Sequence, residues 1–595
     1  MPRRSSGWPN WPAAPRAELG ATTYDKAPAV SAGSASECAR GWDEIAARVR
    51  ERSARVVAIE AFPAVRREHL MELVRRLAPA RVLETSLAFL PPVKIDALVL
   101  PELTDDPVFG RISRLDMRDF LDADRLAAIA HEAQDADGTV VIMGAGASLV
   151  HGADLLLLAE MPRWETQLRQ RRGEVENLGA SNRGERASQQ YRRSYFVDWR
   201  VCDRLKNEAW ERVDFFLDTT RGDEPRLISH GAMENALTAA SSRPFRVVPY
   251  FDPAPWGGEW MRRVCALDPA PPNYGWCFDC VPEENSLLLD FGGRRFETPA
   301  ANLVFRRPAE LLGEHVRALF GAEFPIRFDF LDTMGGGNLS LQVHPLTAYI
   351  REHFGMDYTQ DESYYMLDAG PGATVFLGLR EGIDRDEFAA DLRLAAEGGR
   401  GFPAEQYVNQ FPARPHDHFL IPAGTIHCSG ADGMVLEISA TPYIFTFKLW
   451  DWGRLGLDGQ PRPINVEHGL RNIQWDRDTA FALEHLVNQV SPVADGPGWS
   501  EERTGLHPAE FIETRRHWFT STVPHAHADR GVNVLNLVAG DAAVVESPDR
   551  AFAPFEVHYA ETFIVPAAAG PYTITPVASG AGRHGTIKAF VRPGP

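Results

Sequence analysis

Four residues with metal-binding side chains are spaced so that short strands could bring them together. Gln342 and His344 alternate in the segment LSLQVHP, and residues two apart on a strand face the same side. Glu362 lies at the start of the strand-like segment DESYYML, and His427 follows the turn segment IPAG. Two imidazoles, one carboxylate and one amide oxygen form a mixed set that suits Zn²⁺ with one position left open. A lone histidine on a strand is usually a satisfied core or surface group, so the prediction depends on the combination.

Short strands with dense turn residues must position these side chains. From about residue 241 onward, Gly and Pro are frequent, and apolar runs such as TVFLGL and GMVLEIS are short. That pattern predicts an all-β sandwich or barrel over 241–480 and a second, smaller β unit over 481–595. The segment DRDEFAADLRLAAEGG, between Asp384 and Gly399, has Ala and Leu on one face and predicts a small helical insertion.

Residues 41–240 alternate strand and helix patterns, which predicts a parallel α/β domain. The segments RVVAIE, TVVIM and DLLLL are expected to be buried strands. The opening VVAIEAFPAVRREHL resembles the start of a nucleoside-kinase-type P-loop domain, but it has neither glycine nor lysine between Ile59 and Leu70. Without them the loop cannot cradle phosphates, so we interpret this region as a degenerate kinase-like domain lacking a P-loop, or as a structural module. Residues 1–40 are rich in Pro, Ala, Ser and Gly and predict a disordered tail.

The segment MPRWETQLRQRRG places Arg163, Arg169, Arg171 and Arg172 on or beside a helix. Such a set could bind an anion, but a solvated basic face is the commoner outcome. We therefore predict that these arginines face solvent.

The charge of the chain limits its partners. With 62 basic and 81 acidic residues, the formal charge is −19, which argues against a nucleic-acid or anionic-membrane surface. Runs such as ADLLLLA are too short to span a membrane, and the N-terminus has no apolar run of signal-peptide length. We expect a cytoplasmic protein with no nucleic-acid or membrane partner. The sequence does not indicate an oligomeric state.

The motifs around the predicted ligands resemble those of one family. The segments PWGGEW, LSLQVHP, DESYYML, IPAGTIHCSG, LEIS and FKLWDWGR occur in an order similar to that of type I phosphomannose isomerases, the class I mannose-6-phosphate isomerases. The resemblance covers about 245–595 and implies a cupin fold, with a catalytic zinc domain over 241–480 and a degenerate second cupin domain over 481–595. It also implies one Zn²⁺ per chain, bound by Gln342, His344, Glu362 and His427.

The resemblance further implies an aldose–ketose isomerase that interconverts mannose 6-phosphate and fructose 6-phosphate through a cis-enediolate. The family's active-site arginine falls on Arg454, and a substrate-contacting serine falls on Ser340. Glu437 and Asp451 are candidate acid/base groups, although Glu437 could equally be structural. Lys448 is one of only five lysines, and it is either a contact for the substrate anion or a surface side chain.

Two positions depart from the family pattern. Asp329 and Gln360 stand where the family usually has lysines near the sugar phosphate. We expect Asp329 to point away from the substrate or to pair with Arg327. The departures leave open an isomerase of a different sugar, or a non-catalytic, regulatory sugar-binding cupin. An Fe²⁺-dependent oxygenase is a less favoured third class.

The second β unit carries a further pair of histidines, His525 and His527. An acidic residue a few positions later, expected in a metal-binding cupin, is replaced by Gly531 and Val532. Tyr572 stands where a later histidine would be expected. We therefore predict no second metal.

Overall fold

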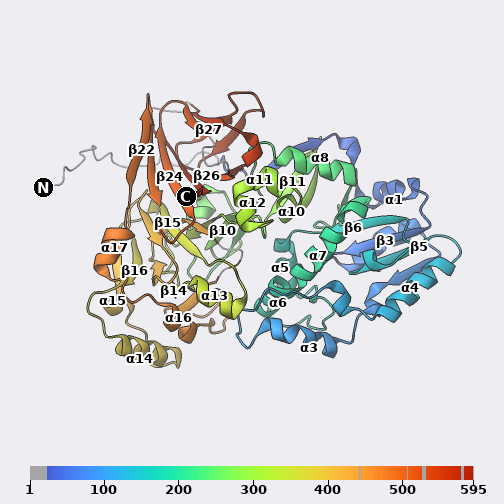
Figure 1. Cartoon of the computed structure of the whole chain (residues 1–595), viewed down its shortest axis with the longest axis horizontal. Coiled ribbons are helices and arrows are strands. Elements are labelled where there is room, and N and C mark those ends of the chain that lie inside the picture. Colours follow the sequence, from blue (N-terminus) through green and yellow to red (C-terminus); the bar gives the residue numbers. More distant parts are fainter. Residues whose placement is uncertain are drawn as a thin grey trace.

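The computed structural model describes residues 23–440, 443, 445–505, 507–525, 531–577 and 582–593. These residues form an α/β lobe, blue to teal in Figure 1, and a β lobe that is mostly yellow to red. None of the helices in this part of the chain combines the length and apolar character needed to cross a membrane. Residues 1–22 of the predicted tail, and His527, lie outside the described residues.

The α/β lobe contains the strands and helices of residues 38–240. They are β2 (Cys38–Arg40), α1 (Gly41–Glu51), β3 (Val56–Ala61), α2 (Arg67–Leu77), β4 (Arg81–Glu84), α3 (Pro92–Leu103), α4 (Ala123–Asp135), β5 (Val140–Gly144), β6 (Leu155–Glu160), α5 (Arg163–Arg171), α6 (Ala187–Arg193), α7 (Trp199–Ala209), β7 (Phe215–Asp218), β8 (Arg226–Ser229) and α8 (His230–Ala240). Their sheet has the order β2-β8-β7-β6-β3-β5-β4. The strands β7, β6, β3, β5 and β4 are parallel to one another. At one edge, β8 pairs antiparallel with β7, and β2 pairs antiparallel with β8.

The predicted α/β class is thus confirmed for this lobe. The apolar runs RVVAIE, TVVIM and DLLLL form β3, β5 and β6, each within two residues of the expected bounds. These strands are buried along nearly their whole length, as expected of parallel strands covered on both faces. The kinase-like description stays a prediction.

The carboxyl edge of this sheet, where doubly wound α/β proteins usually bind ligands, is filled by the chain's own groups. Glu60, near the end of β3, accepts hydrogen bonds from the backbone N–H groups of Gly146 and Ser148, both at 2.8 Å. Glu160, at the end of β6, accepts one from the Thr298 hydroxyl at 3.0 Å. Thr298 lies on a strand outside this sheet, so a segment from later in the chain helps to close the edge.

The predicted tail over 1–40 is wrong for its described second half. β1 (Ala29–Gly33) pairs in parallel with β11 (Ser286–Phe291), which in turn pairs with β12 (Arg294–Pro299). Val30 of β1 is buried, and β2 already belongs to the α/β sheet. These strands are so short that each buries one or two apolar side chains, which leaves no periodicity to detect.

Besides the β11–β12 pair, the first β unit contains two larger sheets with helices around them. The strands of the larger sheet are β9 (Tyr250–Asp252), β10 (Trp276–Cys280), β13 (Arg327–Asp332), β15 (Asp361–Ala369), β18 (His418–Ile421) and β20 (Gly433–Ala440); those of the smaller are β14 (Leu341–Val343), β16 (Thr374–Leu379), β17 (Val408–Pro412), β19 (His427–Ser429) and β21 (Phe447–Trp450). The orders are β18-β15-β20-β13-β10-β9 and β17-β16-β19-β14-β21. The helices are α9 (Trp260–Val264), α10 (Ala301–Arg306), α11 (Pro308–Leu312), α12 (Glu314–Phe320), α13 (Thr347–Phe354), α14 (Arg385–Ala396), α15 (Ala404–Tyr407), α16 (Val466–Asn472) and α17 (Thr479–His485). The predicted helical insertion is α14.

The second β unit adds ten short strands. They are β22 (Ser491–Gly496), β23 (Trp499–Gly505), β24 (Ile512–Phe519), β25 (Val523–His525), β26 (Asn533–Ala539), β27 (Ala542–Glu546), β28 (Phe555–His558), β29 (Thr562–Val565), β30 (Tyr572–Pro576) and β31 (His584–Val591). Two sheets result, in the orders β22-β23-β24-β31-β26-β29 and β25-β30-β27-β28. In this unit the His525 ring stacks on Tyr572 at a centroid distance of 4.7 Å.

The prediction of a solvated basic face is wrong for two of its four arginines, whereas Arg171 and Arg172 are exposed as expected. Arg163 and Arg169 are each only 2% exposed. Arg163 pairs with Asp203 of its own lobe and also with Glu283 of the β lobe. Arg163 therefore helps to hold the lobes together, because partners distant in sequence bring helix α5 into the interface.

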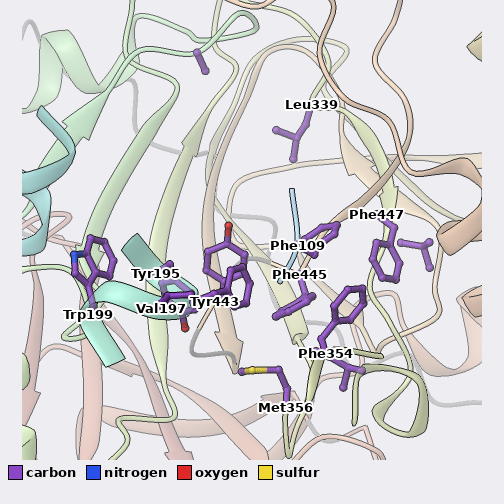
Figure 2. Close-up of a cluster of buried hydrophobic side chains, with 14 of the residues drawn as sticks. Phe109, Tyr195, Val197, Trp199, Leu339, Phe354, Met356, Tyr443, Phe445 and Phe447 are labelled. Carbon is purple, nitrogen blue, oxygen red and sulfur yellow. The ribbon is translucent and has the colours of Figure 1, made fainter. Parts of the chain in front are cut away.

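A cluster of aromatic side chains joins the two lobes (Figure 2). The ring of Phe109 stacks on Phe445 at a centroid distance of 5.1 Å, and Tyr195 lies 4.1 Å from Tyr443. Phe109 and Tyr195 belong to the α/β lobe, and their partners precede β21. Apolar burial of this kind ties the α/β lobe directly to the strands of the first β unit.

Candidate metal and substrate site

The four predicted metal ligands come together inside the first β unit. Gln342 of β14 lies opposite His427 of β19, and His344 follows β14 directly. Glu362 comes from β15 in the larger sheet. Among the described residues, His344, Glu362 and His427 form a group whose ligand atoms lie within 4.8 Å of one another.

Glu362 lies between the two imidazoles. Its Oε2 is 3.0 Å from His344 Nε2, and its Oε1 is 2.8 Å from His427 Nε2. All three side chains are fully buried. Burial of a carboxylate without compensation costs several kcal/mol, so the charge of Glu362 requires a positive partner.

The far side of each imidazole is fixed by a backbone carbonyl. His344 Nδ1 donates to the oxygen of Phe445 at 2.8 Å, and His427 Nδ1 donates to the oxygen of Thr425 at 2.9 Å. Because a carbonyl only accepts, each neutral ring carries its hydrogen on Nδ1 and directs the lone pair of Nε2 toward Glu362. Lone pairs that face a carboxylate need a cation between them, so this donor set fits a divalent metal.

The electrostatics of the site agree with that requirement. Burial acts to raise the pKa of Glu362, but the two imidazoles outweigh it and hold the pKa well below its usual value. Burial acts in the same way to lower the pKa of His344, and Glu362 reverses the effect and raises it. Both shifts have one cause, the close approach of the carboxylate to the two imidazoles, which favours positive charge beside Glu362.

Gln342 is placed to complete the set. Its Nε2 lies 3.1 Å from His427 Nε2. A half-turn of the amide exchanges its nitrogen for its oxygen, which is a metal ligand. Gln342 is therefore beside the other three residues, as the spacing predicted.

The two residues that depart from the family pattern also lie in this site. The carboxylate of Asp329 accepts from Arg327 at 3.2 Å, which confirms the expected pairing. Gln360 Nε2 donates to Glu362 Oε2 at 2.7 Å. Asp329 is therefore partly neutralised, and Gln360 supports a metal ligand instead of facing a phosphate.

Glu437 lies beside the metal ligands on the inner face of the larger sheet. It is opposite Asp329 on one side and opposite Tyr364 on the other. Burial, with Glu362 and Asp329 nearby, raises the pKa of Glu437 well above its usual value. A buried carboxyl group in this position can hold a proton at neutral pH.

Asp451 has a different environment. Its Oδ1 accepts from Ser340 at 2.9 Å and from Arg454 at 2.6 Å, and its Oδ2 accepts from Arg462 at 2.5 Å. Ser340 is two residues before Gln342, so this cluster lies about 7 Å along the strand from the metal ligands. Both oxygens of Asp451 are engaged, which suits a residue that orients the arginines.

Lys448 joins the same cluster. It lies opposite Gln342 in the pairing of β14 with β21, so the two side chains share a face. Burial and the nearby Arg462 lower the pKa of Lys448 to about 8. The side chain thus points into the unit and remains mostly charged at neutral pH.

Sequence reasoning missed Arg462 and Tyr364. Arg462 lies in the segment GQPRPIN, which has no motif of its own, and it reaches Asp451 only because the chain turns back after β21. Tyr364 is two residues after Glu362, and its ring lies 5.7 Å from that of His427. Strand alternation from Glu362 could have indicated Tyr364.

Sequence comparison relates this chain to curated proteins. Over 223 residues it is 31% identical to a mannose-6-phosphate isomerase of Streptococcus mutans, which covers 36% of this chain and 63% of the relative. Over 167 residues it is 27% identical to mannose-6-phosphate isomerase ManA of Bacillus subtilis, which covers 27% of this chain and 50% of the relative. Part of this chain is thus similar in sequence to mannose-6-phosphate isomerases. The chain spans less than two thirds of the length of either isomerase.

The other comparisons concern the α/β lobe and the solved structures. Residues 41–242 match a family model described as a domain of unknown function, DUF8485. A crystal structure of mannose 6-phosphate isomerase from Bacillus subtilis aligns with 59% of this chain and 100% of that chain, with 17% identity and a TM-score of 0.46.

Proposed function

We propose that this chain is a mannose-6-phosphate isomerase that uses one Zn²⁺ and passes through a cis-enediolate. The observation that carries the proposal is the convergence of His344, Glu362 and His427, with Gln342 beside them. The sequence relationship to mannose-6-phosphate isomerases supports the reaction type.

His344, Glu362, His427 and Gln342 would hold the metal. When bound, Zn²⁺ would polarise the sugar carbonyl and stabilise the negative charge that develops on oxygen. The carbonyl oxygens of Phe445 and Thr425 keep each imidazole lone pair aimed at that position. The set is nitrogen and oxygen only, which favours Zn²⁺ over softer metals.

A cationic cluster next to the metal ligands supports a phosphorylated substrate. Arg454 and Arg462 pair with a single carboxylate, that of Asp451, and Lys448 lies near both arginines, which leaves a net charge of +2 by simple count. A sugar phosphate carries about two negative charges at neutral pH. We assign Arg454, Arg462 and Lys448 to the phosphate, with Ser340 as a neutral donor beside them.

Glu437 is our candidate for moving the proton between the two carbon atoms. It lies on the same face as Tyr364 and close to Glu362, whereas Asp451 is bound by three donors. We therefore propose Glu437 as the acid/base group and Asp451 as a positioning residue. If so, Glu437→Gln should abolish exchange of the substrate's C2 hydrogen with solvent while metal content is retained.

The experiment that tests the function is direct conversion of mannose 6-phosphate to fructose 6-phosphate by the full chain. We expect turnover with Zn²⁺, loss after treatment with a chelator, and recovery when Zn²⁺ is added back. Turnover of free mannose alone would replace the proposed substrate with an unphosphorylated sugar. Sugar binding without turnover in the zinc-loaded protein would favour a regulatory, non-catalytic role.

A further inference from the structure

A cavity of about 310 Å³ lies between the two lobes, apart from the cationic cluster. Gln167, Gln170 and Arg171 of α5 line it together with Tyr191 of α6. Tyr250, Asp252, Phe278 and Glu284 line it from the β lobe. The volume is at the small end of the range for ligand pockets and suits one sugar ring.

The polar groups of the cavity are arranged around Glu284. Its Oε2 accepts from Gln167 at 2.7 Å and from Tyr250 at 3.1 Å, and its Oε1 accepts from Tyr191 at 2.8 Å. Each carboxylate oxygen has two lone pairs, so Oε1 can accept one more hydrogen bond. Donors from both lobes thus fix a buried acceptor that still has capacity.

Gln170 adds a second open acceptor. The residue is 4% exposed and lines the cavity, and its Nε2 donates to Ser194 at 2.7 Å. Its Oε1 has no hydrogen-bond partner among the described residues. A buried carbonyl without a partner is unfavourable, and a ligand hydroxyl would supply the missing hydrogen bond.

Charge and shape narrow the class of ligand. Arg171 is bound by both oxygens of Asp252, at 2.7 and 2.9 Å, so the carboxylate of Glu284 leaves the lining one negative charge in excess. That charge disfavours a phosphate. Tyr250 stacks between Trp164 and Phe278, at centroid distances of 3.7 and 4.6 Å, and the stack forms a rigid apolar wall.

From these observations we propose that the cavity between the lobes is a second carbohydrate site, which binds an uncharged sugar through its hydroxyl groups. The α/β lobe then supplies ligand-binding side chains instead of acting only as a support. The site is distinct from the proposed isomerase centre: Tyr250, Phe278, Asp329, Glu437 and Tyr364 form one row across the sheet. At the spacing of neighbouring strands, Phe278 lies about 14 Å from the strand of Glu362.

The test uses the full chain stripped of metal, and free D-mannose, D-glucose and D-fructose as probes in saturation-transfer NMR. We expect at least one hexose to bind at millimolar concentration. Ser188→Trp should fill the cavity from its exposed rim and weaken binding by at least about tenfold. Gln189→Trp, an exposed neighbour on the same helix that does not line the cavity, should bind like the wild type.

Gln170→Leu is a second variant, because it removes the open acceptor without filling the cavity, and it should also weaken binding. Thermal unfolding of each variant shows whether the fold is intact. No hexose binding to the wild type, or equal binding in Ser188→Trp and Gln189→Trp, would overturn the proposal. The isomerase assay is run separately on zinc-loaded protein, so failure of one proposal is distinguishable from failure of the other.

Discussion

Buried carboxylates have different partners in the two lobes. In the α/β lobe, Glu60 accepts from two backbone N–H groups, and Glu160 accepts from side chains that include Thr298. In the first β unit, Glu362 faces the lone pairs of His344 and His427. The first arrangement is complete with protein donors alone, whereas the second has the donor set of a metal site.

This difference indicates how to distinguish buried carboxylates that have a structural role from those that bind a ligand. At the carboxyl edge of the α/β sheet, donors of the chain fill the place where a ligand would lie, so the acids there hold loops and lobes together. At the metal site, backbone carbonyls orient the imidazoles so that their free nitrogens and the carboxylate converge on one place, as metal ligands do. Five predictions test the contrast.

The largest effect is expected at the metal site. His427→Ala should reduce zinc affinity and turnover by more than the 10–100-fold typical of supporting residues, because it removes a ligand. Elemental analysis and the isomerase assay measure both quantities. His418→Ala is the matched control, since His418 is equally buried in the same unit but is not among the ligands. Full zinc retention in His427→Ala would contradict the assignment.

Arg454→Ala should have the next largest effect. It removes a charged group from the cationic cluster and should cost about 2–5 kcal/mol in kcat/KM for mannose 6-phosphate. The loss for free mannose should be much smaller, because that substrate has no phosphate. Arg400→Ala, at an exposed arginine paired with Asp391, is the control. Equal losses on both substrates would assign Arg454 to the enediolate instead.

Glu60→Gln tests the α/β lobe, where protein donors alone bind the buried carboxylate. A glutamine amide can accept from only one of the N–H groups of Gly146 and Ser148 and must direct its own N–H toward the other. We expect the free energy of unfolding to fall by about 1–3 kcal/mol, measured in urea, with no change in zinc content. Glu51→Gln, at an exposed position on α1, should change it by no more than about 0.5 kcal/mol.

The pH dependence of stability should also depend on Glu60. Burial raises the pKa of Glu60 from 4.5 to about 7, although Ser148, Gly146 and Arg212 act to lower it. The folded state therefore holds the proton more tightly than the unfolded state. This stabilisation is complete below about pH 4.5 and is lost as the pH rises through about 7. Between pH 4.5 and 7, the free energy of unfolding measured in urea should decline less in Glu60→Gln than in the wild type. Parallel pH curves for the two proteins would show that Glu60 does not cause the decline.

The smallest effect is expected in a test of ATP binding. The full chain should show no saturable ATP binding in the micromolar range, because the loop after β3 lacks glycine and lysine and the sheet edge is already filled. Isothermal titration calorimetry measures this directly. Micromolar binding would mean that the α/β lobe retains a nucleotide site.

The sequence alone determined the features that depend on near neighbours. Alternation in LSLQVHP predicted that Gln342 and His344 share a face, and apolar runs located β3, β5, β6 and α14. The order of the family-like motifs predicted that Glu362 and His427 belong to the same site. These signals are readable because strand and helix periodicity is carried by residues a few positions apart.

Tertiary structure alone decided the rest. The burial of Arg163, the pairing of β1 and the cavity around Glu284 depend on partners far apart in the chain. The contact of Arg462 with Asp451 depends on the turn of the chain after β21. A charged helix reads as solvated until its counter-charges are known, since a buried arginine is tolerated only when distant acids and carbonyls surround it. The packing of the two lobes brings these acids and carbonyls around the arginine, and the local sequence does not predict that packing.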